Sequence, residues 1–489
     1  MKSILAVVFL AAALPAAFAQ TNPAAVREMS LTDCLAEALR HNYDVQVERY
    51  QPELSLYNLR LAYAGYDPAF TLGGTHDHDH NGQAGFPATL SDANSFNSSL
   101  IGLTPWGMNY TLSGNVAESY GYSFPTNFDG SSGSASVKLT QPLLKNFWTD
   151  NTRLAISVAK IQTKLTDQAL RQQFITTVTA VENAYYELIY ARENLQVQQE
   201  ALELAQTQFD QDSKRVELGS MSPLDVQQDE AQRARSQASL IAAQFSLAVA
   251  ENTLKNLITD NYPQWHDVEL KPTESLNATK QFIDLQDSWT RGLTQRPDLL
   301  EAKLNVEQQG IQIRFLKNQL YPELDLVGSY GVNGAGQEFN NALGQEQAGN
   351  RPFYSYGAQL SVPLGNVAAR NNLKSGRVSE RKLLLQLKQL EQNVLVQIDN
   401  AVKQVRSAWE GAEASRKARV YAEAALDAEQ KKYSVGKSTT FTVLQLQNNL
   451  TAARSQEIRS LADYQEALTN LAAQEGSTLE RRKLDLQLK

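Results

Sequence analysis

Histidine and aspartate alternate in one short segment, His76-Asp77-His78-Asp79-His80, which contains three of the five histidines of the chain. Both residue types can ligate a metal ion. On a β-strand, however, alternate residues lie on one face about 7 Å apart, which is too far for three histidines to share one tetrahedral ion. We therefore interpret the segment as a solvated strand end or external loop, and we predict no metal site and no cofactor.

The chain carries no recognisable catalytic constellation. The sequence lacks G-x-S-x-G, H-E-x-x-H and a P-loop, and its histidines do not pair with a nucleophile. The formal net charge is −8 and 20% of the residues are charged, so there is no basic footprint of nucleic-acid binding. The sequence predicts a protein that is not an enzyme and has no nucleic-acid partner.

Two long stretches of the chain recur. Residues 39–72 align without gaps with 293–326 at an offset of 254, and residues 151–257 align with 368–474 at an offset of 217. A period this long indicates a duplicated supersecondary unit, and such units usually pack side by side around one axis. The duplication favours a wall or tube over an enzyme pocket.

The elements of each unit can be read from their periodicity. Residues 153–216 and 370–433 carry coiled-coil spacing of apolar residues over 64 residues, roughly 96 Å of helix. Each long helix could be a solvent-exposed rod or one stave of a helical barrel. The shorter helical segments are 222–258 and 439–475, with 37 residues each, and 41–66 and 295–320, with 26 each. One of each kind totals 63 residues, so two short helices stacked end to end could cover one long helix, which favours the stave.

Between the helices the chain turns to Gly, Ser, Asn, Thr and aromatic residues with strand-like alternation. The predicted strands are near 69–79, 96–104, 109–118, 134–141, 323–333 and 354–363, and the predicted polar loops are 80–95, 119–133 and 334–352. Strands of about 9–11 residues have the length of a tilted membrane β-strand. Aromatic residues flank these regions, as expected at the two interfaces of a membrane.

The first nineteen residues are typical of a secretory signal peptide. Lys2 precedes an apolar run over 4–14, and Ala17-Phe18-Ala19 gives a cleavage site after Ala19. No later stretch approaches 18 apolar residues, so we expect that any entry into a membrane would be as a barrel.

The chain resembles the TolC-like outer-membrane factor family, which supplies the exit ducts of efflux pumps and type I secretion systems. The resemblance covers about residues 30–475. The segments that carry it are Asn42–Val45, Arg296–Leu299, Ala62–Pro68, Leu316–Pro322, Gln141–Leu143, Val362–Leu364, Val216–Val226 and Tyr433–Val443.

This resemblance implies a fold that is mainly α with membrane β. A homotrimer would form a long α-helical coiled-coil barrel and a shared outer-membrane β-barrel from two internal structural repeats. The implied partners are a periplasmic adaptor (membrane fusion) protein, an inner-membrane transporter and outer-membrane lipid. The family norm is four barrel strands per chain, whereas this sequence has an extra pair around Thr104-Pro105-Trp106-Gly107. The pair could form an extended external hairpin or enlarge the barrel, and we favour the external hairpin.

The implied organisation has five segments. They are the signal peptide 1–19, repeat 1 at 20–258 with strands about 69–141 and a helical hairpin 151–258, an equatorial linker region 259–294, repeat 2 at 295–475 with strands about 323–363 and a hairpin 368–475, and a C-terminal tail 476–489. The linker and the tail would form a mixed belt around the middle of the tunnel.

The hairpin tips are the candidate site. Gly219 and Gly436 stand where a long helix must reverse, a position that favours positive φ. The candidate adaptor-docking residues are Gly219, Ser220, Ser222, Tyr433, Gly436, Ser438 and Thr439. The alternative is a helix-turn-helix loop without a partner.

The resemblance also places a constriction just beyond the tips. Relatives carry rings of carboxylates there, which favour cations. The matching residues here are Asp225, Asp229, Thr442 and Gln445, so the acidic ring is at best partial. For Asp225 the alternative is a helix N-terminal charge that meets the helix dipole.

The sequence thus predicts a passive outer-membrane exit duct of a tripartite efflux pump or type I secretion system, with its helical tunnel in the periplasm. The alternative is a non-conducting trimeric coiled-coil surface or scaffold protein. The matched strand regions favour the duct, because a fibrous scaffold has no need of them. The cargo is not encoded in any motif.

Overall fold

The computed structural model describes residues 26–81, 89–123 and 125–484. The predicted signal peptide and part of the predicted loop 80–95 lie outside these residues. The chain divides into two compact units. The tip unit contains residues 26–42, 180–280 and 408–466, and the strand unit contains 43–179, 281–407 and 467–484.

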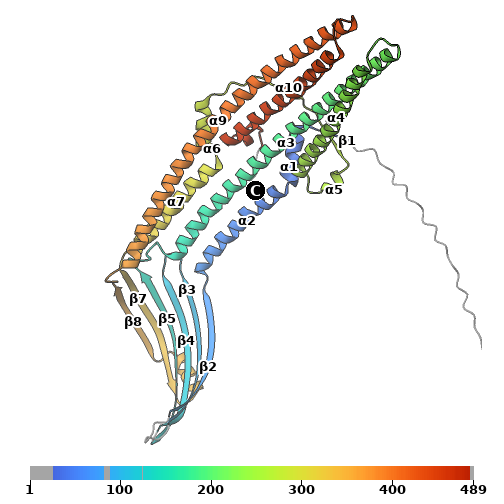
Figure 1. Cartoon of the computed structure of the whole chain (residues 1–489). Helices are drawn as coiled ribbons and strands as arrows, with labels where there is room; N and C mark the ends of the chain where they lie inside the picture. The colour runs from blue at the N-terminus through green and yellow to red at the C-terminus, as the bar shows by residue number, and fades with distance from the viewer. Residues whose placement is uncertain (1–25, 82–88, 124, 485–489) are drawn as a thin grey trace, which may run out of the picture. The chain divides into compact units, whose positions relative to one another are not determined.

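Two very long helices, α3 (Asn151–Glu217) and α9 (Val367–Ser434), contribute to both units (Figure 1). They contain 67 and 68 residues, which confirms the predicted length and continuity. Val178, Val181, Tyr185 and Leu188, which step by 3, 4 and 3 residues along α3 in the predicted coiled-coil spacing, are all buried, at 1% exposure or less. The heptad spacing therefore marks the packed face of α3.

The tip unit contains residues 180–217 of α3 and 408–434 of α9, together with two helices that run back from the tips and a small parallel sheet. The elements are β1 (Val26–Met29), α1 (Leu31–His41), α4 (Pro223–Ile258), α5 (Tyr262–Trp265), β6 (Glu269–Pro272) and most of α10 (Thr440–Glu475). The Tyr185 hydroxyl donates to the Met29 carbonyl at 3.2 Å, which ties the β1–β6 pair to α3. This pair was not predicted, since two strands of 4 residues leave almost no periodicity.

The strand unit holds one six-stranded antiparallel sheet in the order β2-β3-β4-β5-β7-β8 (Figure 1). The strands are β2 (Ala69–Asn81), β3 (Thr89–Leu103), β4 (Asn109–Ser123), β5 (Thr126–Pro142), β7 (Glu323–Gly336) and β8 (Pro352–Ser361). All six predicted strands are present, and most extend into the predicted loops. The predicted loops are rich in Ser, Asn and Gly, which have weak strand propensity. Pairing with the neighbouring strands nevertheless continues through these segments and extends the strands.

The remaining elements of the strand unit are helical. They are α2 (Tyr43–Tyr63), the 3-10 turn η1 (Ala64–Tyr66), α6 (Leu285–Gln295), α7 (Pro297–Asn318), α8 (Phe339–Ala348) and α11 (Thr478–Arg481). Within this unit α2 lies along α3, where Thr166 bonds Ser55 at 3.1 Å, and α7 lies along α9, where Gln309 bonds the Gly376 carbonyl at 3.0 Å. Each long helix thus has a shorter companion.

Two expectations for the strand region are wrong. The extra pair is not an appended external hairpin, because β3 and β4 occupy the second and third places of the continuous sheet. The predicted loop 334–352 contains α8, which ends at Gly349 with φ 67°. Its Ala, Gln and Glu residues favour a helix, and α8 packs so closely on β7 that Gly334 has no room for a side chain.

The register of the sheet separates apolar from polar side chains. Over the part of the sheet nearest the start of α3, large apolar residues that alternate along the strands share one face, and mainly hydroxyl and amide residues between them share the other. Toward the far end of the strands the first face carries polar residues such as His76, His78 and Asp92. There α8 packs on this face, with Phe339 against Phe96. The exposed apolar residues on the first face are Phe70, Leu72, Phe96, Leu112, Val137, Leu139, Leu326, Tyr330, Tyr354, Tyr356 and Leu360. Among the described helices, none is both long and apolar enough to span a bilayer.

Candidate functional site: the tips of the helical hairpins

The first tip reverses the chain through a glycine-capped turn. Gly219 has φ 71°, its N–H bonds the Val216 carbonyl, and the N–H of Ser220 bonds the Arg215 carbonyl, each at 2.9 Å. This pair of bonds satisfies the last carbonyls of α3. Ser222 then caps α4 by accepting from the Leu224 N–H at 3.3 Å. The sequence correctly predicted a left-handed glycine here.

The second tip repeats this geometry. Gly436 has φ 72°, and its N–H bonds the Tyr433 carbonyl at 3.0 Å. Thr439 accepts from the Thr442 N–H at 3.4 Å at the start of α10, and Ser438 donates to Glu429 at 2.6 Å. Bonds from Lys432 and Ser438 hold the pKa of the Glu429 carboxyl below its usual value. Both tips are closed turns that are capped by residues of the same hairpin.

Four exposed apolar side chains surround the tips, and sequence reasoning missed them. Leu218 and Leu224 are 82% and 61% exposed, and Val435 and Phe441 are 66% and 64% exposed. Each residue of the first pair matches one of the second at the offset of 217. That shared register was the signal that could have found them, since an apolar residue retained in both copies of an exposed turn has no packing role within the chain. We call these four residues the tip knobs.

Tyr433 does not project from its tip. Its hydroxyl donates to Asp212 of α3 at 2.9 Å and lies 3.1 Å from the Thr440 hydroxyl, while the Arg215 guanidinium stands 5.2 Å from the centre of its ring. Tyr433 therefore joins the two hairpins within the tip unit.

Beside this link, Asp212 and Asp229 form a buried pair of carboxylates, each with no exposed surface. Asp212 also accepts from Arg215 at 3.2 Å, but among the described residues no donor reaches either oxygen of Asp229. Burial, then the Asp212 carboxylate, then Asp225 raise the pKa of Asp229 to about 7. A proton on Asp229 would let one of its two oxygens donate to the Asp212 carboxylate.

The candidate constriction residues have different surroundings. Asp225 in the first turn of α4 and Thr442 in that of α10 are half-exposed, and Gln445 is exposed. Asp229 is enclosed by its own chain, which does not favour a place for it on a tunnel wall. A constriction formed by Asp225, Thr442 and Gln445 stays a prediction.

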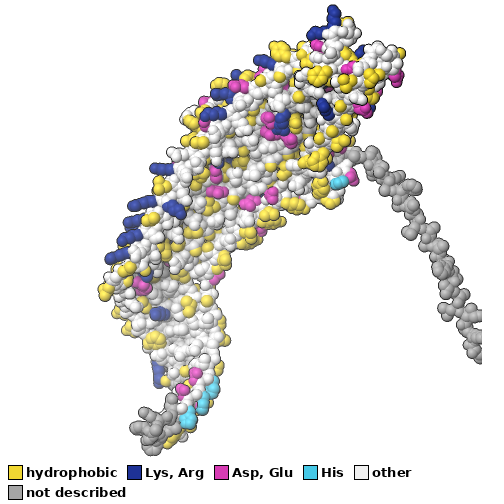
Figure 2. Space-filling view, viewed as in Figure 1, with side chains coloured by type: hydrophobic (Ala, Val, Ile, Leu, Met, Phe, Trp, Pro, Cys, Tyr) yellow, Lys and Arg dark blue, Asp and Glu magenta, His cyan; other side chains and the backbone are white. Residues whose placement is uncertain are grey.

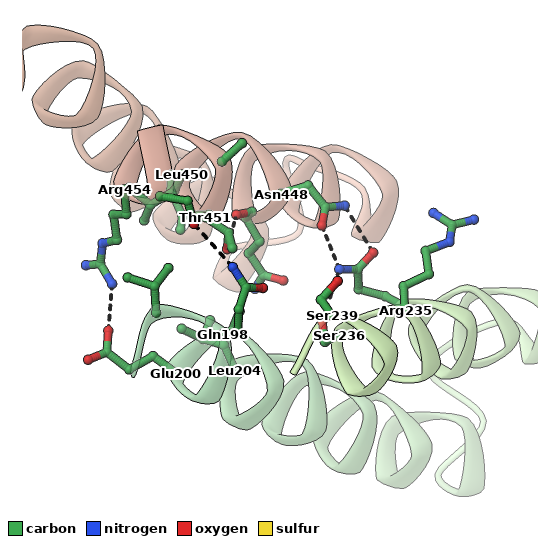
Figure 3. A pocket seen from close by; sticks show the side chains of 17 residues that line it. Gln198, Glu200, Leu204, Arg235, Ser236, Ser239, Asn448, Leu450, Thr451 and Arg454 are labelled. Atoms are coloured by element: carbon green, nitrogen blue, oxygen red, sulfur yellow. Dashed lines mark hydrogen bonds and ion pairs between the residues drawn. The ribbon is translucent and has the colours of Figure 1, made fainter. Parts of the chain in front are cut away.

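A polar cavity of about 210 Å³ lies between the two hairpins, farther from the tips, and is lined mainly by residues of α3, α4 and α10 (Figure 3). Gln232 of α4 and Asn448 of α10 exchange two amide hydrogen bonds across it, at 2.6 and 3.0 Å. Arg454 pairs with Glu200 at 2.8 Å on the opposite side. These polar links join α10 to α3 and α4 and add to the apolar packing of buried residues such as Val443 and Leu450.

The histidine segment lies at the C-terminal end of β2, which we call the outer end of the sheet, and Figure 2 shows histidines together there. His78 pairs with Asp92 at 2.5 Å and His76 lies 2.8 Å from Asn94, both on β3. Within the described ranges, no group of three or more His, Cys, Asp or Glu side chains is placed to hold a metal ion.

Comparisons with known proteins agree with this architecture. Outer membrane protein TolC of Salmonella enteritidis is 26% identical over 375 residues, which cover 76% of this chain and 73% of that protein. The pyoverdine export outer membrane protein OpmQ of Pseudomonas aeruginosa is 25% identical over 58% of each chain. The Campylobacter jejuni CmeC outer membrane channel shares the fold with a TM-score of 0.68 at 13% identity, over 94% of this chain and 90% of that one.

The model of one protein family matches most of the chain. It is described as Outer membrane efflux protein, and it matches residues 34–259 and 290–477. The two matched segments contain both hairpins, both tips and all six strands of the large sheet. The chain therefore belongs to the outer membrane efflux protein family.

Proposed function

We propose that the chain is a passive outer-membrane exit duct of a tripartite efflux pump or type I secretion system. The observation that carries this function is the two-faced sheet. Its apolar face suits lipid and its face of Ser, Thr and Asn suits water, as in the wall of a membrane channel. Membership of the outer membrane efflux family supports the same location and role.

The helices supply the periplasmic part of the duct. α3 and α9 differ by one residue in length, α4 and α10 both contain 36 residues, and α2 and α7 contain 21 and 22. These matched lengths support two internal structural repeats. Three chains would place twelve staves around one tunnel and share one β-barrel, because an open sheet edge cannot stay unpaired in lipid.

The tips would meet a periplasmic adaptor, which in turn would bind an inner-membrane transporter. The glycine-capped turns and the tip knobs form a rigid end with apolar projections, suited to a helical hairpin of a partner. Energy would come from the transporter. The names of relatives include pyoverdine export and cation efflux, so membership of the family leaves the cargo open.

The test is assembly and conductance of the full chain. The protein extracted from outer membranes should migrate as a heat-sensitive trimer and should give discrete single-channel currents in planar bilayers. Heat-dissociated protein is the matched control and should give no currents. A trimer in the outer membrane without currents would favour the non-conducting scaffold, and a soluble monomer would refute both.

A further inference from the structure

The extra strand pair carries the same two faces as the rest of the sheet. One row of paired residues crosses all six strands on the apolar face, and its members are Phe70, Leu100, Leu112, Val137, Tyr330 and Tyr354. Leu100 and Leu112 belong to β3 and β4. Their apolar stripe is thus continuous with that of the other four strands.

The opposite face is polar in the same two strands. Ser99, Ser113 and Ser136 are paired in one row, and the Ser113 hydroxyl lies 3.0 Å from that of Ser136. The larger apolar exceptions on this face are Ile101, Leu103, Phe128, Val327 and Phe353. A hairpin surrounded by water on both sides has no need of this separation, whereas a strand between lipid and a water-filled lumen requires it.

The pair also spans the full height of the sheet. β3 and β4 are paired continuously from Leu90–Tyr122 to Leu103–Asn109. Their turn lies at the end where α3 begins, because Arg153 near the start of α3 donates to the Pro105 carbonyl. The β3–β4 hairpin therefore runs from the helical end of the sheet to the outer end.

The two edges of the sheet are complementary. β2 and β8 have one strand partner each in the described sheet, and they run in opposite directions because all five pairings are antiparallel. β8 of one chain can therefore continue the antiparallel order with β2 of a second copy. Unpaired N–H and C=O groups along an open edge are costly in hydrocarbon, and closure of the barrel removes them.

We propose that three copies close one barrel of eighteen strands, six from each chain, by pairing β8 of each copy with β2 of the next. This inference rests on the proposed trimeric duct and departs from the twelve strands of the family norm. Barrel diameter grows roughly in proportion to strand number, so the pore would be about 1.5 times as wide as a twelve-strand barrel. Its lumen would be lined mainly by hydroxyl and amide side chains, with charged residues such as Asp77, Lys138 and Asp325 among them.

The first arm of the test asks whether β3 and β4 face lipid. Single cysteines replace Leu100, Leu112, Ser99 and Ser113 in the full chain in lipid bilayers, with the buried Cys34→Ala as background. Each cysteine carries a nitroxide. Leu100→Cys and Leu112→Cys should be relaxed more by oxygen, and Ser99→Cys and Ser113→Cys more by a water-soluble nickel chelate. Val137→Cys and Ser136→Cys on β5 are the matched controls, since β5 belongs to the wall in either architecture.

The controls separate two failures. Suppose that Val137→Cys is relaxed more by oxygen and Ser136→Cys more by the nickel chelate, while all four β3 and β4 positions are accessible to the chelate. The eighteen-strand barrel is then wrong, and the proposed duct is retained. If the β5 pair does not alternate, the membrane duct itself is wrong.

The second arm tests closure by disulfides. Barrel closure tilts the strands and shifts the register of β8 of one copy against β2 of the next. The shift must be an even number of residues, so that the polar faces of the two copies lie on the same side. Thr71→Cys on β2 is therefore combined in turn with cysteines at Ser355, Gly357, Gln359 and Ser361 on β8, and Tyr356→Cys, on the opposite face, is the control. One in-phase combination should give covalent products that end at three chains. Failure of every in-phase combination, or products that end at another number, would overturn the closure.

Discussion

At the scale of single residues, Asp229 is the most unusual group of the tip unit. It has no exposed surface, it stands beside Asp212, and its pKa is raised to about 7 from an ordinary 3.8. Arg215 and Tyr433 donate to Asp212, so the proton of the pair resides on Asp229. Because the folded state binds this proton more tightly than the unfolded state, the stabilisation is complete below about pH 4 and is lost as the pH rises through about 7.

We therefore expect the tip to open more often at pH 8 than at pH 5. One pKa unit corresponds to about 1.4 kcal/mol, so the effect is on the order of a few kcal/mol at most. Hydrogen exchange of peptides around 205–235, corrected for intrinsic rates, measures it. Asp229→Asn should remove the pH dependence by supplying a neutral donor. Asp225→Asn, at a half-exposed site in the same helix, is the control. It removes only the weakest contribution to the shift and should retain most of the pH dependence.

At the scale of elements, the helical reversals depend on left-handed glycines. In Gly436→Ala the new methyl group meets no atom within 4 Å. The substitution nevertheless forces alanine to φ 72°, which lowers the stability of the turn by about 1–2 kcal/mol. Gly411→Ala, in the helix that precedes this turn, is the matched control. Gly411 lies inside α9 with no neighbour within 4 Å, and alanine stabilises a helix interior by roughly 0.5–1 kcal/mol. Local exchange should rise at the second tip in the first variant and fall in α9 in the second. Equal changes in local exchange in the two variants would contradict the role of Gly436 as a left-handed helix cap.

The same elements show what a sequence can reveal. Helix length and the tip glycines were predictable, because a 3.6-residue period and a duplicated Gly are local signals. Strand order was not predictable, because the place of β3 and β4 in the sheet follows only from pairings between distant residues, such as Leu112 with Val137. The acid pair was also hidden, because Asp212 and Asp229 lie on different helices and only their packing brings them together.

At the scale of the whole molecule, the proposed duct would be joined to its pump through the tips. Leu218 and Val435 are the matched tip knobs that flank the two left-handed glycines, and both are largely exposed. Burial of one such side chain in a partner contributes about 1.5–3 kcal/mol, and 1.4 kcal/mol is a factor of ten in affinity. Loss of both knobs should therefore weaken adaptor binding far more than it changes the duct.

We predict that Leu218→Ser combined with Val435→Ser lowers affinity for the cognate periplasmic adaptor at least about tenfold. Binding of the purified trimer to the adaptor measures the loss, and bilayer conductance should stay unchanged because the knobs do not contribute to the sheet. Phe282→Ser is the matched control, since it removes a side chain that is 98% exposed but lies outside the tips. If the control weakens binding as much as the tip variant, or if the tip variant binds normally, the adaptor does not dock through the tip knobs.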